Sequence, residues 1–237
     1  MEFQNIRVTV LGWQGPVPGA MGACSGYLVE EASGEALVLD LGSGSLARLL
    51  QYKNPCELSA IILTHLHWDH ISDMLPLSYL QGVHAVPVFS QTEPLLQRQV
   101  LENAGWQMRN HENCQIGPFK LSFLQAHHPV PASCVKMECA GRTIVYTGDT
   151  NTLEGLETFA QGADLLIADA GLCESEWAEQ KPHLSPRLCA QLAKNAGVRK
   201  LMLTHLSAKH APETILGEAS AIFPEAILAC DGLRISV

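Results

Sequence analysis

The stretch Ile61-Ile-Leu-Thr-His-Leu-His-Trp-Asp-His70 is the most informative part of the chain. It begins in an apolar run, Ala60 to Leu63, that has the length and composition of a buried strand. Four potential metal ligands follow within six residues: His65, His67, Asp69 and His70. Because alternate side chains of an extended segment share a face, the first two can point the same way, and the turn after them can aim the other two at a second point nearby. Imidazole and carboxylate together suit zinc, and also iron or manganese. We therefore expect a metal site here rather than a polar turn that happens to be rich in histidine.

Size and composition indicate one large globular domain over residues 1–237. The hydrophobic fraction is 47% and the charged fraction 16%, which is enough to bury a large core and argues against disorder. The formal net charge is -9, and the bases are scattered, with Arg199-Lys200 as the only adjacent pair. The sequence therefore shows no basic stripe of the kind that nucleic-acid-binding proteins use.

The eight cysteines and the N-terminus indicate a cytoplasmic protein with reduced thiols. No two cysteines form a C-x-x-C pair, and Met1-Glu-Phe-Gln-Asn does not resemble the start of a signal peptide. No apolar run approaches the length needed to span a membrane. We expect the cysteines to be small core residues, and Cys173 is the one to check for proximity to a metal.

Strands and helices alternate along the whole chain, with no linker, which favours a single layered α/β domain. Strands are predicted at 6–11, 27–30, 36–41, 60–63, 86–89, 120–126, 134–139, 143–146, 164–168, 200–203 and 226–230. Helices are predicted at 46–52, 93–104, 153–159, 185–197 and 212–222, with a further short helix after the metal stretch that Pro76 should kink or divide. Ser185 and Pro186 are typical of a helix start, and Gly197 of a helix end. The segment 12–26, rich in Gly and Pro, either walls a site or serves only as a series of turns.

Four more predicted strands end in ligand-type residues. They are followed by His127-His128, by Asp149 in Thr-Gly-Asp-Thr, by Asp169 and by His205. Leu63-Thr-His-Leu66 also recurs as Leu203-Thr-His-Leu206, each time after an apolar strand. Each of these features is weak alone, because a histidine before proline or an aspartate in a turn is common. Together they favour a two-metal centre at the carboxyl ends of the strands, where α/β sheets place their sites.

The order His65-Leu-His67-Trp-Asp69-His70, then His128, Asp149 and His205, resembles the metallo-β-lactamase superfamily. The resemblance covers nearly the whole chain and implies a four-layer αββα sandwich with a dinuclear metal site between the sheets. It implies that one metal is held by His65, His67 and His128, and the other by Asp69, His70 and His205. Asp149 would bridge them. Antibiotic-cleaving members usually carry a cysteine ligand instead of this bridging aspartate, so a β-lactam substrate is not expected.

Within the superfamily the chain is most similar to the ribonuclease Z-like phosphodiesterases. Three segments carry this similarity: His128-Pro-Val-Pro, Asp164-Leu-Leu-Ile-Ala-Asp169 and Pro182-His183-Leu-Ser. The similarity implies that His183, oriented by Asp169, acts as the proton donor, and that Asp69 is both ligand and catalytic residue. The chain lacks a long inserted arm of the kind that grips tRNA, and it is acidic. We therefore expect a small-molecule substrate and no membrane or tRNA partner, and the family likeness suggests a homodimer.

The function predicted from the sequence is a dinuclear metal-dependent hydrolase. We expect it to cleave small phosphodiesters or cyclic nucleotides by means of a metal-bridging hydroxide. Two divalent ions are implied, with Zn²⁺ favoured and Mn²⁺ or Fe as alternatives. The rival predictions are an ester, thioester or lactone hydrolase on the same fold, and a ribonuclease Z-type tRNA 3′-processing endonuclease. His127 could orient a ligand or face solvent, and the sequence does not choose between the two.

Overall fold

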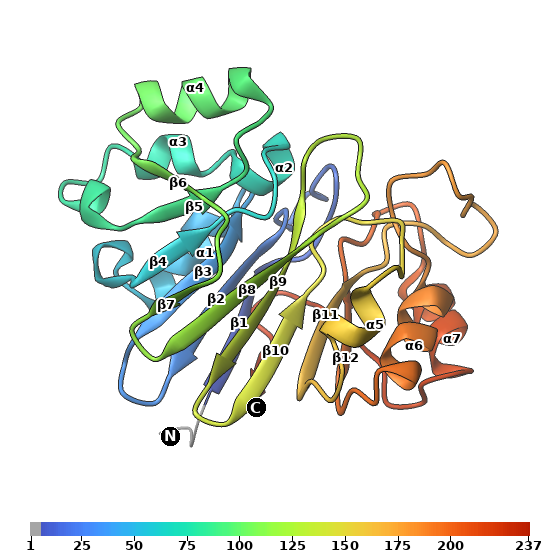
Figure 1. The fold of residues 1–237 in the computed structure, drawn as a ribbon. Helices are drawn as coiled ribbons and strands as arrows, with labels where there is room; N and C mark the ends of the chain where they lie inside the picture. The colour runs from blue at the N-terminus through green and yellow to red at the C-terminus, as the bar shows by residue number, and fades with distance from the viewer. Residues whose placement is uncertain (1–5) are drawn as a thin grey trace.

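The computed structural model describes residues 6–237, which form two seven-stranded sheets packed face to face (Figure 1). The N-terminal segment 1–5, to which the signal-peptide expectation refers, lies outside the described residues. In spatial order, the first sheet contains β14 (Arg234–Ser236), β1 (Ile6–Gly12), β2 (Gly26–Glu31), β3 (Ala36–Leu41), β4 (Ala60–Ile62), β5 (Val88–Ser90) and β6 (Met108–Asn110). The second sheet contains β13 (Ile227–Leu228), β12 (Leu201–Thr204), β11 (Leu165–Asp169), β10 (Arg142–Tyr146), β9 (Ser133–Cys139), β8 (Phe119–Gln125) and β7 (Cys114–Ile116).

Helices cover the outer face of each sheet (Figure 1). The first sheet is covered by α1 (Ser45–Tyr52), α2 (Trp68–Ile71), α3 (Met74–Leu77) and α4 (Leu95–Asn103), with short 3₁₀ turns at Pro55–Glu57 and Val83–Ala85. The second is covered by α5 (Leu156–Phe159), α6 (Pro186–Asn195) and α7 (Pro212–Ser220). One apolar core lies between the sheets and one lies under each helical layer. The predicted four-layer αββα sandwich is therefore confirmed.

Each sheet contains a run of parallel strands that ends at the site. In the first sheet, β3 to β6 are parallel, and in the second, β10 to β13. Parallel strands are buried on both faces, which explains why β4 and β12 read as short apolar runs. One Leu-Thr-His-Leu segment directly follows β4 and the other begins in the last two residues of β12, so the partial repeat in the sequence marks similar positions in the two sheets.

Several element boundaries differ from the prediction. The strand expected at 86–89 begins at Val88, the helix expected at 153–159 begins at Leu156, and β13 occupies only part of 226–230. The helix after the metal stretch is divided before Asp73, and Pro76 lies inside α3. A proline is tolerated there because the N–H groups in the first turn of a helix have no intrahelical acceptor, so no hydrogen bond is lost. In contrast, Ser185 caps Leu188 N at 3.3 Å and Gly197 follows α6 at a φ of 65°, as predicted.

Three strands were missed: β6, β7 and β14. Each has three residues, and each carries exposed polar side chains at or near the edge of its sheet. Such segments have no apolar run that a sequence pattern could reveal, and backbone pairing with a neighbour defines them instead. Among residues 6–237, every helix is too short or too polar to cross a lipid bilayer.

Candidate metal centre

The carboxyl ends of five strands bring all the predicted site residues together. His65, His67, Asp69 and His70 follow β4, while His128 follows β8, Asp149 follows β10, Asp169 ends β11 and His205 follows β12. His183 comes from the segment between β11 and α6. Their ligand atoms form three groups, two of which share Asp149 and His205, and within each group every atom lies within 4.8 Å of the others. The site residues predicted from the sequence therefore lie together in the folded chain.

The first group, the three-histidine cluster, consists of His65, His67 and His128. Nδ1 of His67 lies 3.1 Å from Nε2 of His65 and 3.1 Å from Nε2 of His128. The other ring nitrogen of His65 is 3.2 Å from Thr64 Oγ1, and that of His128 is 3.2 Å from the carbonyl of Pro182. Burial lowers the pKa of all three imidazoles, which keeps them neutral. Three neutral imidazoles with converging nitrogens, two of them held at the outer nitrogen, are a suitable donor set for a transition metal.

The second group, the mixed cluster, consists of Asp69, His70, Asp149 and His205. Oδ2 of Asp69 lies 3.1 Å from His205 Nε2 and 3.6 Å from His70 Nε2. His205 has a φ of 57°, in the left-handed region that a side chain other than glycine occupies at a cost of roughly 1 kcal/mol. This backbone conformation aims the imidazole of His205 back across the end of the sheet toward Asp69.

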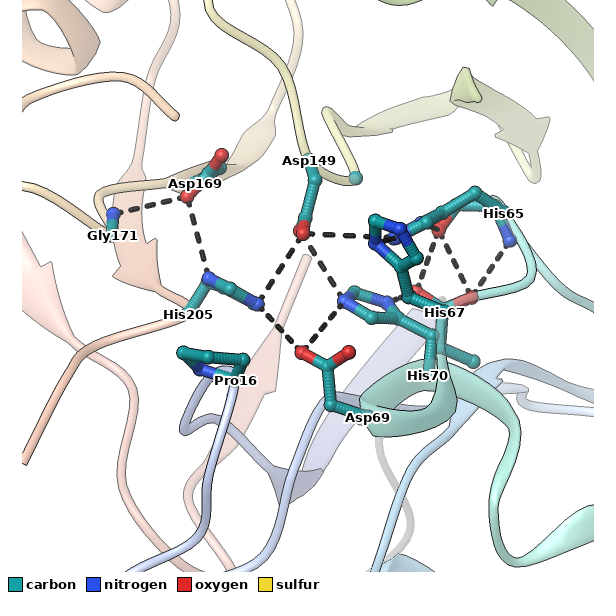
Figure 2. A network of polar contacts seen from close by, with 12 residues as sticks. Pro16, His65, His67, Asp69, His70, Asp149, Asp169, Gly171 and His205 are labelled. Atoms are coloured by element: carbon teal, nitrogen blue, oxygen red, sulfur yellow. Dashed lines mark hydrogen bonds and ion pairs between the residues drawn. The ribbon is translucent and has the colours of Figure 1, made fainter. Parts of the chain in front are cut away.

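Asp149 lies between the two clusters (Figure 2). Its Oδ2 is 3.7 Å from His65 Nε2 and 3.4 Å from His205 Nε2, and its Oδ1 is 3.3 Å from His70 Nε2. Burial raises the pKa of this carboxyl, but His205 and His70 outweigh burial and hold it well below its usual value. The buried atoms His70 Nε2 and Asp149 Oδ1 have no hydrogen-bond partner within residues 6–237. Two buried polar atoms that face each other without a hydrogen bond are costly unless a cation lies between them, so the residues fit bound metal.

Asp40 is a functional residue that sequence reasoning missed. This fully buried carboxylate at the end of β3 accepts from the backbone N of Thr64 at 2.7 Å and lies 2.7 Å from His70 Nδ1. It also accepts from the hydroxyl of Tyr146 at 2.9 Å. Asp40 thus fixes the orientation of His70 and the exit of the chain from β4, as carboxylates behind metal-binding histidines commonly do. The available signal was a lone charge within Ala-Leu-Val-Leu-Asp-Leu, an otherwise apolar strand.

Asp169 and His183 form a pair beside the mixed cluster. His183 Nδ1 lies 2.9 Å from Asp169 Oδ2, and the His183 ring stacks on His205 with centroids 4.7 Å apart. Asp169 is itself held by the backbone N–H groups of Thr150 and Gly171, at 3.1 and 3.0 Å. Burial lowers the pKa of His183, but the charge and hydrogen bond of Asp169 raise it to about 9. A protonated imidazole is thereby placed next to the metal ligands.

Two adjoining cavities open onto these side chains. One, of about 160 Å³, is lined by His67, Asp69, His128 and Asp149 together with His183 and His205. The other, of about 420 Å³, shares His183 and His205 and extends over Lys181 and Lys209. A substrate can therefore reach the metal ligands and His183 from one side of the molecule.

The segment 12–26 walls both cavities, which resolves one of the alternatives left open by the sequence. Pro16 lines both of them, and Gly15 lines the larger. The carbonyl of Trp13 accepts from Leu206 N at 3.0 Å, which attaches this segment to the residue after His205. A Cβ on Gly15 would lie 2.0 Å from His205 Nε2, so only glycine leaves room for the ligand nitrogen. His127 is exposed, and of the two roles considered for it the structure favours the solvent-facing one.

The fold and the two clusters define an α/β protein with ligand sets for divalent metal ions at the carboxyl edges of two facing sheets. A family model for the beta-lactamase superfamily domain matches residues 38–206. The probable metallo-hydrolase YhfI of Bacillus subtilis is 31% identical over 92% of this chain and 94% of its own length. The crystal structure of YhfI matches with a TM-score of 0.91 at 29% identity, covering 98% of this chain and 99% of that one.

Two ribonuclease Z proteins are also similar. The ribonuclease Z of Haloferax volcanii is 26% identical over 98% of this chain and 95% of its own length. The short form of human tRNase Z has the same fold, with a TM-score of 0.78 at 21% identity over 98% of this chain and 99% of that one. The chain belongs to the metallo-β-lactamase superfamily and is a hydrolase of that superfamily, whose members bind divalent metal.

Proposed function

We propose that this protein is a dinuclear metal-dependent phosphodiesterase that acts on small phosphodiesters or cyclic nucleotides. The observation that carries the proposal is the Asp169–His183 pair, which places an imidazole Nε2 next to the metal ligands and at the wall shared by both cavities. Cleavage of a phosphodiester needs a proton at the leaving oxygen, and a group in this position can donate it.

The two clusters would hold one divalent ion each, with Asp149 between them. Three imidazoles in one cluster, and a carboxylate with two imidazoles in the other, favour zinc, while manganese and iron also accept these ligands. When bound, the two ions would supply Lewis acidity and a water of lowered pKa. Asp69 would serve as a ligand beside His205, whose Nε2 lies 3.1 Å from Asp69 Oδ2 and would face the same ion.

The protein's own side chains would perform the remaining steps. Asp169 would fix the tautomer and orientation of His183, because its Oδ2 lies 2.9 Å from the His183 Nδ1. His183 Nε2 would then donate its proton to the departing oxygen. The wall formed by Pro16 and Pro182 would limit the access of bulk water to the reacting phosphorus.

The volumes of the cavities, and insertions that a ribonuclease Z relative carries and this chain does not, both favour a small substrate. The smaller cavity has a volume of about 160 Å³ and the larger about 420 Å³, which suits a small molecule. The alignment with the H. volcanii ribonuclease Z runs over 309 residues although this chain has 237, so that relative carries insertions absent here. The similarity to ribonuclease Z supports phosphodiester chemistry, and the absence of those insertions favours substrates smaller than tRNA.

The test is a comparison of substrates on metal-stripped protein supplied with zinc or manganese. We expect metal-dependent cleavage of bis(p-nitrophenyl) phosphate, and little or no turnover of a p-nitrophenyl ester or a lactone. His183→Gln should lower kcat on the diester by roughly 10²–10⁴-fold while the bound metal is retained. His127→Gln is the matched control, since the side chain of His127 is exposed to solvent, and this variant should leave kcat unchanged.

The same assay can reject the proposal. Turnover of the ester or lactone without any diester cleavage would move the protein to the carbonyl hydrolases of the superfamily. Full diester activity in His183→Gln would show that the proton comes from another group. Asp149→Ala should lose metal as well as activity, and this distinguishes damage to the centre from loss of the proton donor.

A further inference from the structure

A separate group of ligand-type side chains shares no residue with the metal centre or with the Asp169–His183 pair. It consists of Cys173, Glu176 and His210, and we name it the cysteine cluster. Each residue offers one ligand atom, and the three atoms lie within 4.8 Å of one another. None of the three belongs to the three-histidine cluster or the mixed cluster. We propose that the cysteine cluster binds a further transition-metal ion of the zinc type.

The backbone brings these three residues together from two neighbouring strand ends. Cys173 and Glu176 lie on one turn after β11, where the N–H groups of Glu176 and Trp177 donate to the Cys173 carbonyl at 2.9 and 3.1 Å. Residues three apart on such a turn present their side chains to the same side. His210 comes from the segment after β12, where its N–H donates to the Ser207 carbonyl at 3.1 Å. Because β11 and β12 are adjacent and parallel, both segments leave the same edge of the sheet.

The donor set is one that zinc prefers. Glu176 Oε2 lies 2.9 Å from His210 Nε2, and the Cys173 side chain is buried while that of Glu176 is half exposed. A thiolate, an imidazole and a carboxylate can fill three positions of a tetrahedral site and leave the fourth to water. The thiolate disfavours magnesium and calcium, which take oxygen ligands.

Metal binding at this position would release one proton. Burial raises the pKa of the Cys173 thiol, and the neighbouring carboxylates Glu218 and Glu176 raise it further. The free thiol therefore keeps its proton at neutral pH, and a cation that binds its sulfur displaces that proton to solvent. The two carboxylates that disfavour a bare thiolate would favour the bound cation.

A bound ion would also join two walls of the larger cavity. Glu176 and His210 line the cavity of about 420 Å³ together with His183 and His205. The ion would therefore connect the segment that carries His183 to the segment that follows His205. This inference does not depend on which bond the protein hydrolyses.

Cobalt(II) provides a test that reports only on the thiolate. The full chain is stripped of metal and titrated with cobalt(II), and the near-ultraviolet charge-transfer absorption of a cobalt–thiolate bond is recorded. The three-histidine and mixed clusters contain no sulfur ligand, so this absorption should come from the cysteine cluster alone. Metal content per chain, measured by inductively coupled plasma mass spectrometry, gives an independent readout.

We expect Cys173→Ser to abolish the absorption and to lower the metal content by one equivalent per chain. Glu176→Gln, at a half-exposed position where folding is not at risk, should weaken cobalt binding in this cluster by at least roughly tenfold. Two controls should keep the absorption: Cys230→Ser, an exposed thiol elsewhere, and Cys24→Ser, a buried thiol whose pKa is raised by burial and by nearby Asp69. Asp149→Ala should lose metal from the main centre and still show the absorption.

Two results would overturn the proposal. The first is a wild-type protein that takes up cobalt without any thiolate absorption. The second is an absorption that persists in Cys173→Ser or disappears in Cys24→Ser, which would assign the sulfur to another site. Neither result bears on the phosphodiesterase proposal, since that is tested by turnover and by His183.

Discussion

The two sheets contribute to the metal centre in different ways. The first sheet supplies four ligand-type side chains from one short segment after β4, and a single buried carboxylate, Asp40, supports that segment from behind. The second sheet supplies its residues one at a time, from the ends of separate strands: His128, Asp149, Asp169 and His205. On the first side His65 and His70 are fully buried while His67 and Asp69 line the smaller cavity, and the second side borders both cavities and carries the proposed proton donor, His183.

This difference suggests a division of labour between the two halves of the fold. Buried ligands on the first side would hold metal in a fixed position, since His65 and His70 are each oriented by a buried side chain, Thr64 and Asp40 respectively. The second side combines ligands with the openings that a substrate needs. Substitutions behind the ligands of each side should separate these two contributions.

Replacement of Asp40 by alanine should have the largest effect. The variant loses the partner of His70 Nδ1, of Thr64 and of Tyr146 at once, within a fully buried site. Removing one member of a buried charged network typically costs 3–5 kcal/mol, so we expect a loss of roughly that size in the free energy of unfolding. Zinc occupancy should fall as well. Urea unfolding and metal analysis measure the two effects.

Asp231→Ala is the matched control for this prediction. Asp231 has two partners where Asp40 has three, namely Trp13 Nε1 at 2.7 Å and Arg48 at 2.8 Å, but its side chain is 42% exposed. Exposed ion pairs contribute about 0–1 kcal/mol, so this variant should unfold near the wild-type urea concentration. Equal losses in the two variants would show that Asp40 is an ordinary polar contact and not the support of the first side.

The buried side chain of His111 should make the stability of the fold depend on pH, in addition to any effect of the metal-centre histidines. Its Nδ1 lies 3.0 Å from Ser133 Oγ, at the start of β9 in the second sheet, and 3.3 Å from Gln91 Nε2, directly after β5 of the first sheet. Burial lowers the pKa of His111 to about 4, whereas an unfolded histidine has a pKa of about 6.5. Between these values the unfolded chain binds more protons, so stability is fully present above pH 6.5 and is lost as the pH falls toward 4.

The size of this effect can be isolated with one variant. Between pH 7 and pH 5 the wild type should lose about 2 kcal/mol of unfolding free energy because of His111. Over the same pH interval His111→Gln should lose about 2 kcal/mol less unfolding free energy than the wild type. The contribution of the metal-binding histidines is the same in both proteins. Identical pH profiles would show that His111 accepts a proton in the folded state without cost. The junction it makes between the sheets would then be weak.

The sequence revealed the first side of the centre better than the second. His65, His67, Asp69 and His70 could be recognised because they lie within six residues after an apolar strand. His128, Asp149 and His205 are each unremarkable in their local sequence, and only their order and their positions after strands identified them. Asp40 and Gly15 could not be assigned roles, because their roles depend on which distant side chains pack against them.

The fold, too, was predicted only where local sequence defines an element. The layered α/β class and the central strands follow from apolar runs of adequate length, as the confirmed sandwich shows. The edge strands β6, β7 and β14 do not, because each is defined by backbone pairing with a neighbour and not by its own side chains. Helix α5 is shorter than predicted since only its last turn is regular, after Gly155 at a φ of 70°.

Two buried tyrosines provide the finest comparison between the two sides. Tyr27 and Tyr146 pack against each other with ring centroids 5.0 Å apart, and both are fully buried. The hydroxyl of Tyr146 donates to Asp40, whereas that of Tyr27 bonds to Thr204 Oγ1 on β12. Replacing either by phenylalanine keeps the ring and removes one hydrogen bond, so we expect each variant to lose about 1 kcal/mol of unfolding free energy.

The two variants should differ in metal affinity although they match in stability. Tyr146→Phe removes a donor from Asp40, which changes the charge that Asp40 presents to His70, so zinc binding measured against a competing chelator should weaken. Tyr27→Phe leaves Asp40 and its partners in place and should bind zinc as the wild type does. If both variants lost affinity equally, the support would pass through the packing of the two rings. If only Tyr146→Phe did, the hydrogen-bond network behind His70 would be the feature that makes the first side of the centre rigid.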